Sequence, residues 1–172
     1  MLGNGAWIWE VEMAIFYSFH YQRDSWRIHQ LMNMGAVEDG YSTPNRQEWE
    51  QVKAKGDQAI RNWIDSQMAY KRAVVVLVGK ETAGRRWVDY EIRKAWDDKR
   101  PLVGIRINGL KNAIGQVDPK GANPFDSIFT QSGYPISNWV NLHDPTGYTS
   151  DQVYASIRAN LLTWIANAYK RV

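Results

Sequence analysis

The sequence predicts an α/β protein with a doubly wound, mostly parallel sheet. Residues 73–78 (AVVVLV) form an unbroken apolar run, which is typical of a strand buried on both faces. Similar runs occupy residues 14–19 and 102–107. Helical patterns rather than hairpin turns separate these runs, so successive strands are expected to pair in parallel through right-handed crossovers.

The helices are expected in the intervals between the strands. Asp24 or Ser25 can cap a first helix that ends near Asn33. Thr43–Pro44 is a favourable opening for a second helix, and Gly56–Asp57 separates it from a third. A fourth helix follows the central strand and ends before Pro101.

The remaining segments complete a five-stranded sheet. Residues 36–39 are a short strand candidate between the first two helices, and residues 138–142 are another. Residues 108–150 hold four of the six prolines, so we expect an irregular insertion before the last helix. Thr149 and Gln152 have capping-box spacing at the start of that helix. This order of elements predicts a flavodoxin-like topology with strand order 2-1-3-4-5.

Composition limits the classes of function. A chain of 172 residues predicts one domain, which we place at residues 13–172 after an N-terminal extension at residues 1–12. The net charge of +3, without a compact basic run, argues against a nucleic-acid partner. No apolar run approaches the ~20 residues of a membrane span, and the N-terminus does not resemble a signal peptide. We therefore expect a soluble cytoplasmic protein without a membrane partner.

Glu91 stands out on the helix after the central strand. With Trp87 at zero, a helix of about 100° per residue places Val88, Ala95 and Ile92 at roughly 100°, 80° and 140°. Glu91 falls at about 40°, as the only charged side chain within this apolar arc. A carboxylate in such a place has either a structural ion-pair partner or a functional role.

The predicted topology brings Glu91 close to the end of the first strand. Strands 1 and 3 are neighbours in the order 2-1-3-4-5, and ligands of open α/β sheets bind at the carboxyl ends of the strands where this order reverses. Phe19 and His20, at the end of strand 1, should therefore border the same crevice as Glu91.

The familiar phosphate-binding and metal-binding motifs are absent. There is no P-loop and no Gly-x-Gly-x-x-Gly after the first strand. The chain has no cysteine, and its three histidines lack metal-ligand spacing, so we expect no metal site. A carboxylate, a histidine and aromatic residues suit cleavage of a glycosidic bond, in which the carboxylate stabilises an oxocarbenium-like transition state. These residues permit that chemistry but do not establish it.

Two separated motifs carry a family resemblance. Residues 16–21 (FYSFHY) and residues 85–92 (RRWVDYEI) resemble the TIR-like family, and within it the TIR-like component of Thoeris antiphage systems. Arg85 stands where the usual TIR motif has a serine or another small residue. Further matching pieces occur in order at Asn33, around Trp49, and at residues 102–105 and 121–126.

The resemblance implies a TIR fold that uses NAD as a substrate rather than as a bound cofactor. It implies release of nicotinamide and formation of a cyclic ADP-ribose isomer, a diffusible messenger that activates a separate effector protein. Glu91 takes the place of the family's catalytic glutamate, and Phe19, His20 and Asn33 are the expected substrate-binding residues. A phage-derived activator and self-association into a homo-oligomer are further candidate partners.

Two other readings remain open from the sequence. The chain can be a non-catalytic TIR-like interaction module in which Glu91 forms a structural ion pair. It can also be a nucleotide-binding flavodoxin relative, which would copurify with a flavin.

Overall fold

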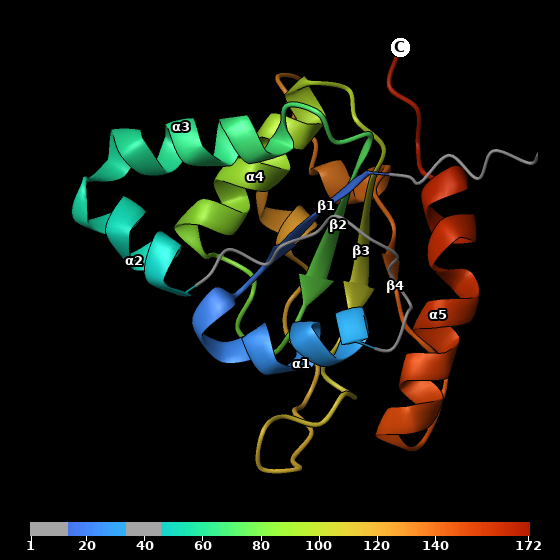
Figure 1. Ribbon diagram of the computed structural model, residues 1–172. Helices are drawn as coiled ribbons and strands as arrows, with labels where there is room; N and C mark the ends of the chain where they lie inside the picture. Colours follow the sequence, from blue (N-terminus) through green and yellow to red (C-terminus); the bar gives the residue numbers. More distant parts are fainter. Residues whose placement is uncertain (1–13, 34–45) are drawn as a thin grey trace, which may run out of the picture.

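The computed structural model describes residues 14–33 and 46–172 (Figure 1). The N-terminal extension at residues 1–12, the strand expected at residues 36–39 and the helix opening at Thr43–Pro44 lie outside the described residues. All three, and the domain boundary after residue 12, stay predictions.

The described strands form a parallel sheet. Strands β1 (Ile15–Phe19), β2 (Ala73–Val78), β3 (Leu102–Arg106) and β4 (Leu142–His143) pair in the order β1-β2-β3-β4. The parallel α/β fold is therefore confirmed, and β1 lies beside the central strand as expected. A fifth strand and the full order 2-1-3-4-5 stay predictions, because the second of the five strands would fall at residues 36–39.

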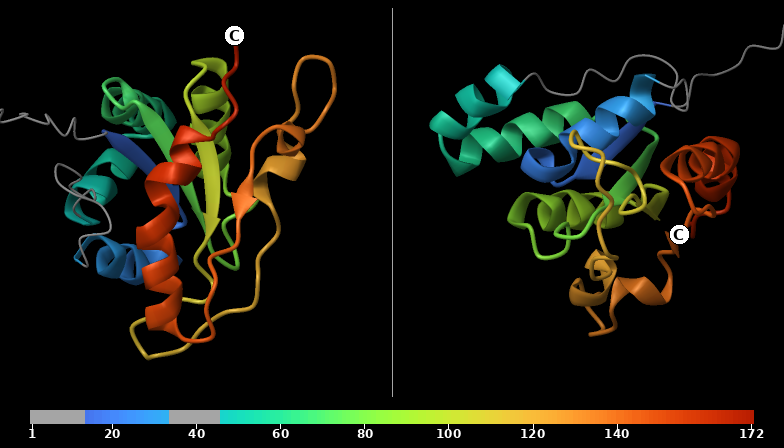
Figure 2. Two further views of the ribbon diagram at one scale, coloured as in Figure 1. Left: turned by 90° about the vertical axis from the view of Figure 1, so that its right-hand side faces the viewer. Right: turned by 90° about the horizontal axis from the view of Figure 1, so that it is seen from below.

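Helices cover both faces of the sheet (Figures 1 and 2). Helices α1 (Tyr21–Asn33) and α5 (Ser150–Ala166) pack on one face, and α3 (Asp57–Met68) and α4 (Arg86–Asp97) on the other. Helix α2 (Arg46–Ala54) joins α3 and packs two partly buried side chains on the second core. None of the helices in the described part of the chain is long and apolar enough to cross a lipid bilayer.

The central strand explains why two cores form. Every residue of β2 is buried, and its side chains alternate between the two faces. Val75 and Leu77 join the core with α1 and α5, whereas Val74 and Val76 join the core with α3 and α4. An apolar residue at every position is required because helices cover both faces.

Helix α1 begins earlier than the sequence predicts. The carbonyl of His20 accepts the backbone N–H of Asp24 at 2.9 Å, and His20 Nδ1 accepts that of Arg23 at 3.3 Å. The His20 carbonyl therefore accepts the first hydrogen bond within the helix, and its side chain satisfies one of the free N–H groups, so the expected cap at Asp24 or Ser25 is wrong. Asp24 instead lies in the first turn and is fully buried.

The segment at residues 108–150 is largely irregular, as expected, and passes beyond the carboxyl ends of β2 and β3 (Figure 1). It contains two short 3₁₀ helices, Pro124–Ser127 and Ile136–Asn138. The strand expected at residues 138–142 is wrong in position, because pairing with β3 begins only at Leu142. The N–H of Val140 donates to the carbonyl of Ile136 at 2.9 Å, and this helical turn buries both side chains.

The start of α5 confirms the capping box. Thr149 Oγ1 accepts the backbone N–H of Gln152, and the side chain of Gln152 accepts the backbone N–H of Thr149, each at 3.3 Å. These reciprocal bonds satisfy two N–H groups that the helix itself leaves unpaired.

Candidate active site

A cavity of about 320 Å³ opens at the carboxyl end of β1, beside the first turns of α4. Its volume lies at the lower end of the range of about 300–1,000 Å³ that is typical of small-molecule sites. The end of β1, the start of α1, the α2–α3 pair and the start of α4 all contribute to its wall. Its lining is rich in aromatic residues: Phe16, Tyr17, Phe19, Tyr21, Trp49, Trp63 and Trp87.

Glu91 lines this cavity from α4. Ser18, on β1, donates a hydrogen bond from Oγ to Glu91 Oε2. Burial raises the pKa of Glu91 to about 8, and the Ser18 hydrogen bond acts in the opposite direction. The carboxyl group is buried and therefore mainly protonated at neutral pH, while the residue as a whole is partly exposed.

The surroundings of Glu91 do not support a structural ion pair. Within residues 14–33 and 46–172, no salt bridge of 4.0 Å or less involves its carboxylate, and Ser18 is its only hydrogen-bond partner. The buried carboxyl group thus faces a cavity and a hydroxyl group. This is the arrangement that the functional interpretation of Glu91 requires.

His20 lies at the same cavity and is buried. Its Nδ1 accepts the backbone N–H of Arg23, so the proton of the neutral imidazole resides on Nε2. Burial, followed by the positive charge of Arg85, lowers the pKa of His20. The neutral ring can donate one hydrogen bond from Nε2 to a ligand.

The structure brings three of the four expected site residues together. Phe19, His20 and Glu91 all line the cavity. Asn33 is exposed at the last residue of α1 and is not part of the cavity lining among the described residues. Its role in substrate binding stays a prediction.

Sequence reasoning missed Ser18. Ser18 is 1% exposed within an otherwise apolar strand, and a buried hydroxyl requires a partner. The isolated serine in an apolar strand is the feature of the sequence that could have identified this residue. Its partner is 73 residues away in the sequence, so only the fold identifies it.

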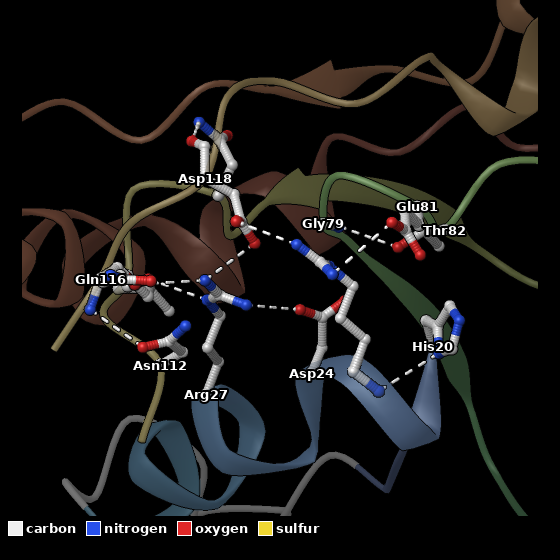
Figure 3. A network of polar contacts seen from close by, with 12 residues as sticks. His20, Asp24, Arg27, Gly79, Glu81, Thr82, Asn112, Gln116 and Asp118 are labelled. Carbon is white, nitrogen blue, oxygen red and sulfur yellow. Dashed lines mark hydrogen bonds and ion pairs between the residues drawn. The ribbon is translucent and has the colours of Figure 1, made fainter. Parts of the chain in front are cut away.

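A buried polar cluster holds α1 against the irregular segment beside the site (Figure 3). Arg27 Nη1 contacts Asp24 Oδ1 at 2.8 Å, and its Nη2 contacts Asp118 Oδ2 at 2.9 Å. Its Nε donates to the carbonyl of Leu110 at 2.8 Å. The cluster therefore fixes the start of α1, and with it His20. In the described part of the chain, no three His, Cys, Asp or Glu side chains gather to hold a metal ion.

The parallel α/β fold, with a carboxyl group on the helix after its central strand, agrees with the class of TIR-like domains, to which the family comparison assigns the chain. The model of the Thoeris protein ThsB, TIR-like domain, matches residues 16–112, more than half of the chain. A Bacillus cereus (strain MSX-D12) protein, named "Putative cyclic ADP-D-ribose synthase ThsB1", is 32% identical over 140 residues. That alignment covers 77% of this chain and 71% of the relative. The chain belongs to the ThsB TIR-like family of Thoeris proteins.

Proposed function

We propose that this protein cleaves the bond between nicotinamide and ribose in NAD and forms a cyclic ADP-ribose isomer. The observation that carries the proposal is the Glu91 carboxyl group, which accepts a hydrogen bond from Ser18 at an aromatic cavity and forms no salt bridge within the described residues. The name of the Bacillus cereus relative supports the same reaction. The product would act as a cytoplasmic messenger in antiphage defence and would reach a separate effector protein by diffusion.

The reaction mainly requires that the positive charge of its transition state be stabilised. When the bond between ribose C1′ and the pyridinium nitrogen breaks, its electron pair neutralises nicotinamide, and the ribosyl group becomes an oxocarbenium-like cation. Ionised Glu91 stabilises that cation. A nucleophile within the ADP-ribosyl group captures C1′ and loses a proton, which closes the ring, whereas capture by water would give linear ADP-ribose. The positive charge on the nicotinamide ring of bound NAD lowers the pKa of Glu91 and so favours its ionised form.

The charge distribution of the cavity suits a dinucleotide. Four cationic side chains line it, and Glu91 is the only acidic residue in the described lining; the cations are Lys53, Lys71, Arg85 and Arg86. Such groups complement the diphosphate of NAD. We assign Phe19 and His20 to substrate binding, with His20 Nε2 as a hydrogen-bond donor.

Glu91→Gln should abolish turnover, because the amide has nearly the same shape but cannot carry negative charge. The experiment measures nicotinamide and cyclic product in phage-infected cells that express the wild type or the variant, so that any phage-derived activator is present. Asp97→Asn is the matched control, because Asp97 lies on the same helix with its side chain 77% exposed. Product formation by Glu91→Gln at the wild-type level would refute the proposal.

The same variant tests the reading as a non-catalytic module. If Glu91 were held in a structural ion pair, Glu91→Gln would lower the free energy of unfolding. The raised pKa has the opposite consequence: between pH 4.5 and about 8 the unfolded chain ionises Glu91 while the folded chain keeps its proton, so wild-type stability falls as pH rises. Glu91→Gln removes this loss and should be at least as stable as the wild type at pH 7.5 in urea denaturation.

A further inference from the structure

A continuous series of aromatic rings lines the cavity that also holds Glu91. We define the aromatic series as Phe19, Tyr21, Trp49 and Trp63, all of which line the cavity. Successive ring centroids are 6.0, 6.2 and 5.7 Å apart. The series begins at Phe19, the last residue of β1, and ends at Trp63 on α3. It therefore runs along the cavity wall from the end of β1 to the α2–α3 pair.

Trp49 has the geometry of a stacking surface. It is only half-buried, and its two neighbours are tilted by 43° and 57° relative to its ring. Neither neighbour covers a face of the indole as a parallel ring would. Because Trp49 also lines the cavity, part of its apolar surface is available to a ligand.

The burial pattern of α2 is a second observation that distinguishes Trp49 from the other residues of this helix. Trp49 and Val52 are the partly buried hydrophobic residues that α2 packs against the core, whereas the side chains around them are exposed. A helix needs few anchors of this kind, and a leucine would bury similar apolar surface. An indole at the cavity provides in addition a large flat face, which is the feature that nucleobases recognise.

We propose that Trp49, flanked by Tyr21, is the stacking platform for the second base of the dinucleotide, the adenine. This inference rests on the proposed function, which places the nicotinamide ribose at Glu91. Trp49 lines the cavity from α2 and Glu91 lines it from α4, so a dinucleotide with its nicotinamide ribose at Glu91 can place its second base against Trp49. Trp49 is thus a substrate-binding residue that determines specificity for a dinucleotide over a mononucleotide.

The test measures binding of two half-substrates by calorimetry in a Glu91→Gln background, where no turnover occurs. ADP carries the adenine end, and nicotinamide mononucleotide carries the reacting end. Trp49→Ala should weaken ADP binding by roughly tenfold or more, as expected for loss of a base–aromatic stack. Binding of nicotinamide mononucleotide should change less than about twofold. Trp26→Ala, which removes a tryptophan that is 47% exposed on α1 and lies outside the cavity lining, should change neither.

Trp49→Leu separates stacking from anchoring of α2, because leucine keeps an apolar anchor without a flat face. Trp49→Leu should lose ADP affinity like Trp49→Ala, and Trp49→Phe should keep part of it. Equal losses for both ligands, or wild-type ADP binding by Trp49→Leu, would overturn the stacking role. If either result is obtained while the otherwise wild-type protein still shows turnover that depends on Glu91, only the stacking role is refuted and the proposed function still holds. Absence of both nucleotide binding and turnover would refute the proposed function together with the inference.

Discussion

At the scale of single residues, two opposing interactions set the protonation of Glu91. Burial raises its pKa to about 8, while the hydrogen bond from Ser18 favours the ionised form. If the ionised carboxylate is required, kcat/KM should rise with pH and level off above about 8, because kcat/KM reports the free enzyme.

Ser18→Ala should shift the midpoint of this pH profile to a higher pH. Loss of the hydrogen bond removes the interaction that lowers the pKa of Glu91, so a larger fraction of the carboxyl group stays protonated at pH 7. The pH dependence of nicotinamide release measures the midpoint, and activity at high pH should recover most of the loss. Ser132→Ala, in an exposed loop, is the control. A loss of activity that is equal at every pH would contradict this positioning role.

At the scale of elements, the attachment of α1 depends on a buried charge cluster. Arg27 and Asp24 are 1% and 0% exposed, and Arg27 also contacts Asp118. A buried ion pair adds little net stability relative to an apolar pair, but removal of one partner leaves an uncompensated buried charge. The cluster therefore holds α1, and with it His20, in one position.

Arg27→Ala should lower the free energy of unfolding by about 3–5 kcal/mol, because Asp24 loses its buried partner. Urea denaturation measures the loss. The double variant Asp24→Leu/Arg27→Met should recover a large part of it, since neither charge is then buried alone. A loss of less than about 1 kcal/mol for Arg27→Ala would show that the cluster opens to water.

At the scale of the whole molecule, the irregular segment at residues 108–150 packs at the carboxyl edge of the sheet, where the candidate site also lies. Gly121 lies so close to the loop after β2 that an added Cβ would be 2.3 Å from the carbonyl oxygen of Gly79 and 2.7 Å from that of Lys80. Arg106, at the end of β3, donates to the carbonyl of Gly121 at 2.6 Å. The segment thus packs backbone against backbone over the carboxyl end of the sheet.

Gly121→Ala should displace this segment, because backbone atoms cannot yield as a flexible side chain does. We expect faster amide hydrogen exchange across residues 108–123 and a stability loss of about 1–3 kcal/mol. Ala122→Val adds volume at the next, exposed position and should leave exchange unchanged. If hydrogen exchange in Gly121→Ala is as slow as in the wild type, the loop after β2 moves to make room and the irregular segment stays in place.

Much of this architecture follows from local sequence pattern. The valine-rich run of β2, the apolar runs of β1 and β3 and the capping box at Thr149 all form where the sequence predicts. Glu91 was marked by its position on an apolar helix face, and parallel topology alone brought it towards Phe19 and His20. These features depend on the periodicity of single elements, which the sequence carries directly.

The tertiary structure alone decided the partners of these residues. Ser18 and Glu91 are 73 residues apart, and Arg27 and Leu110 are 83 apart, so no local pattern pairs them. The early start of α1 at His20, the late start of β4 and the aromatic series also depend on contacts between elements. Periodicity determines which face of an element is buried, whereas the identity of the group that meets that face depends on how the elements pack together.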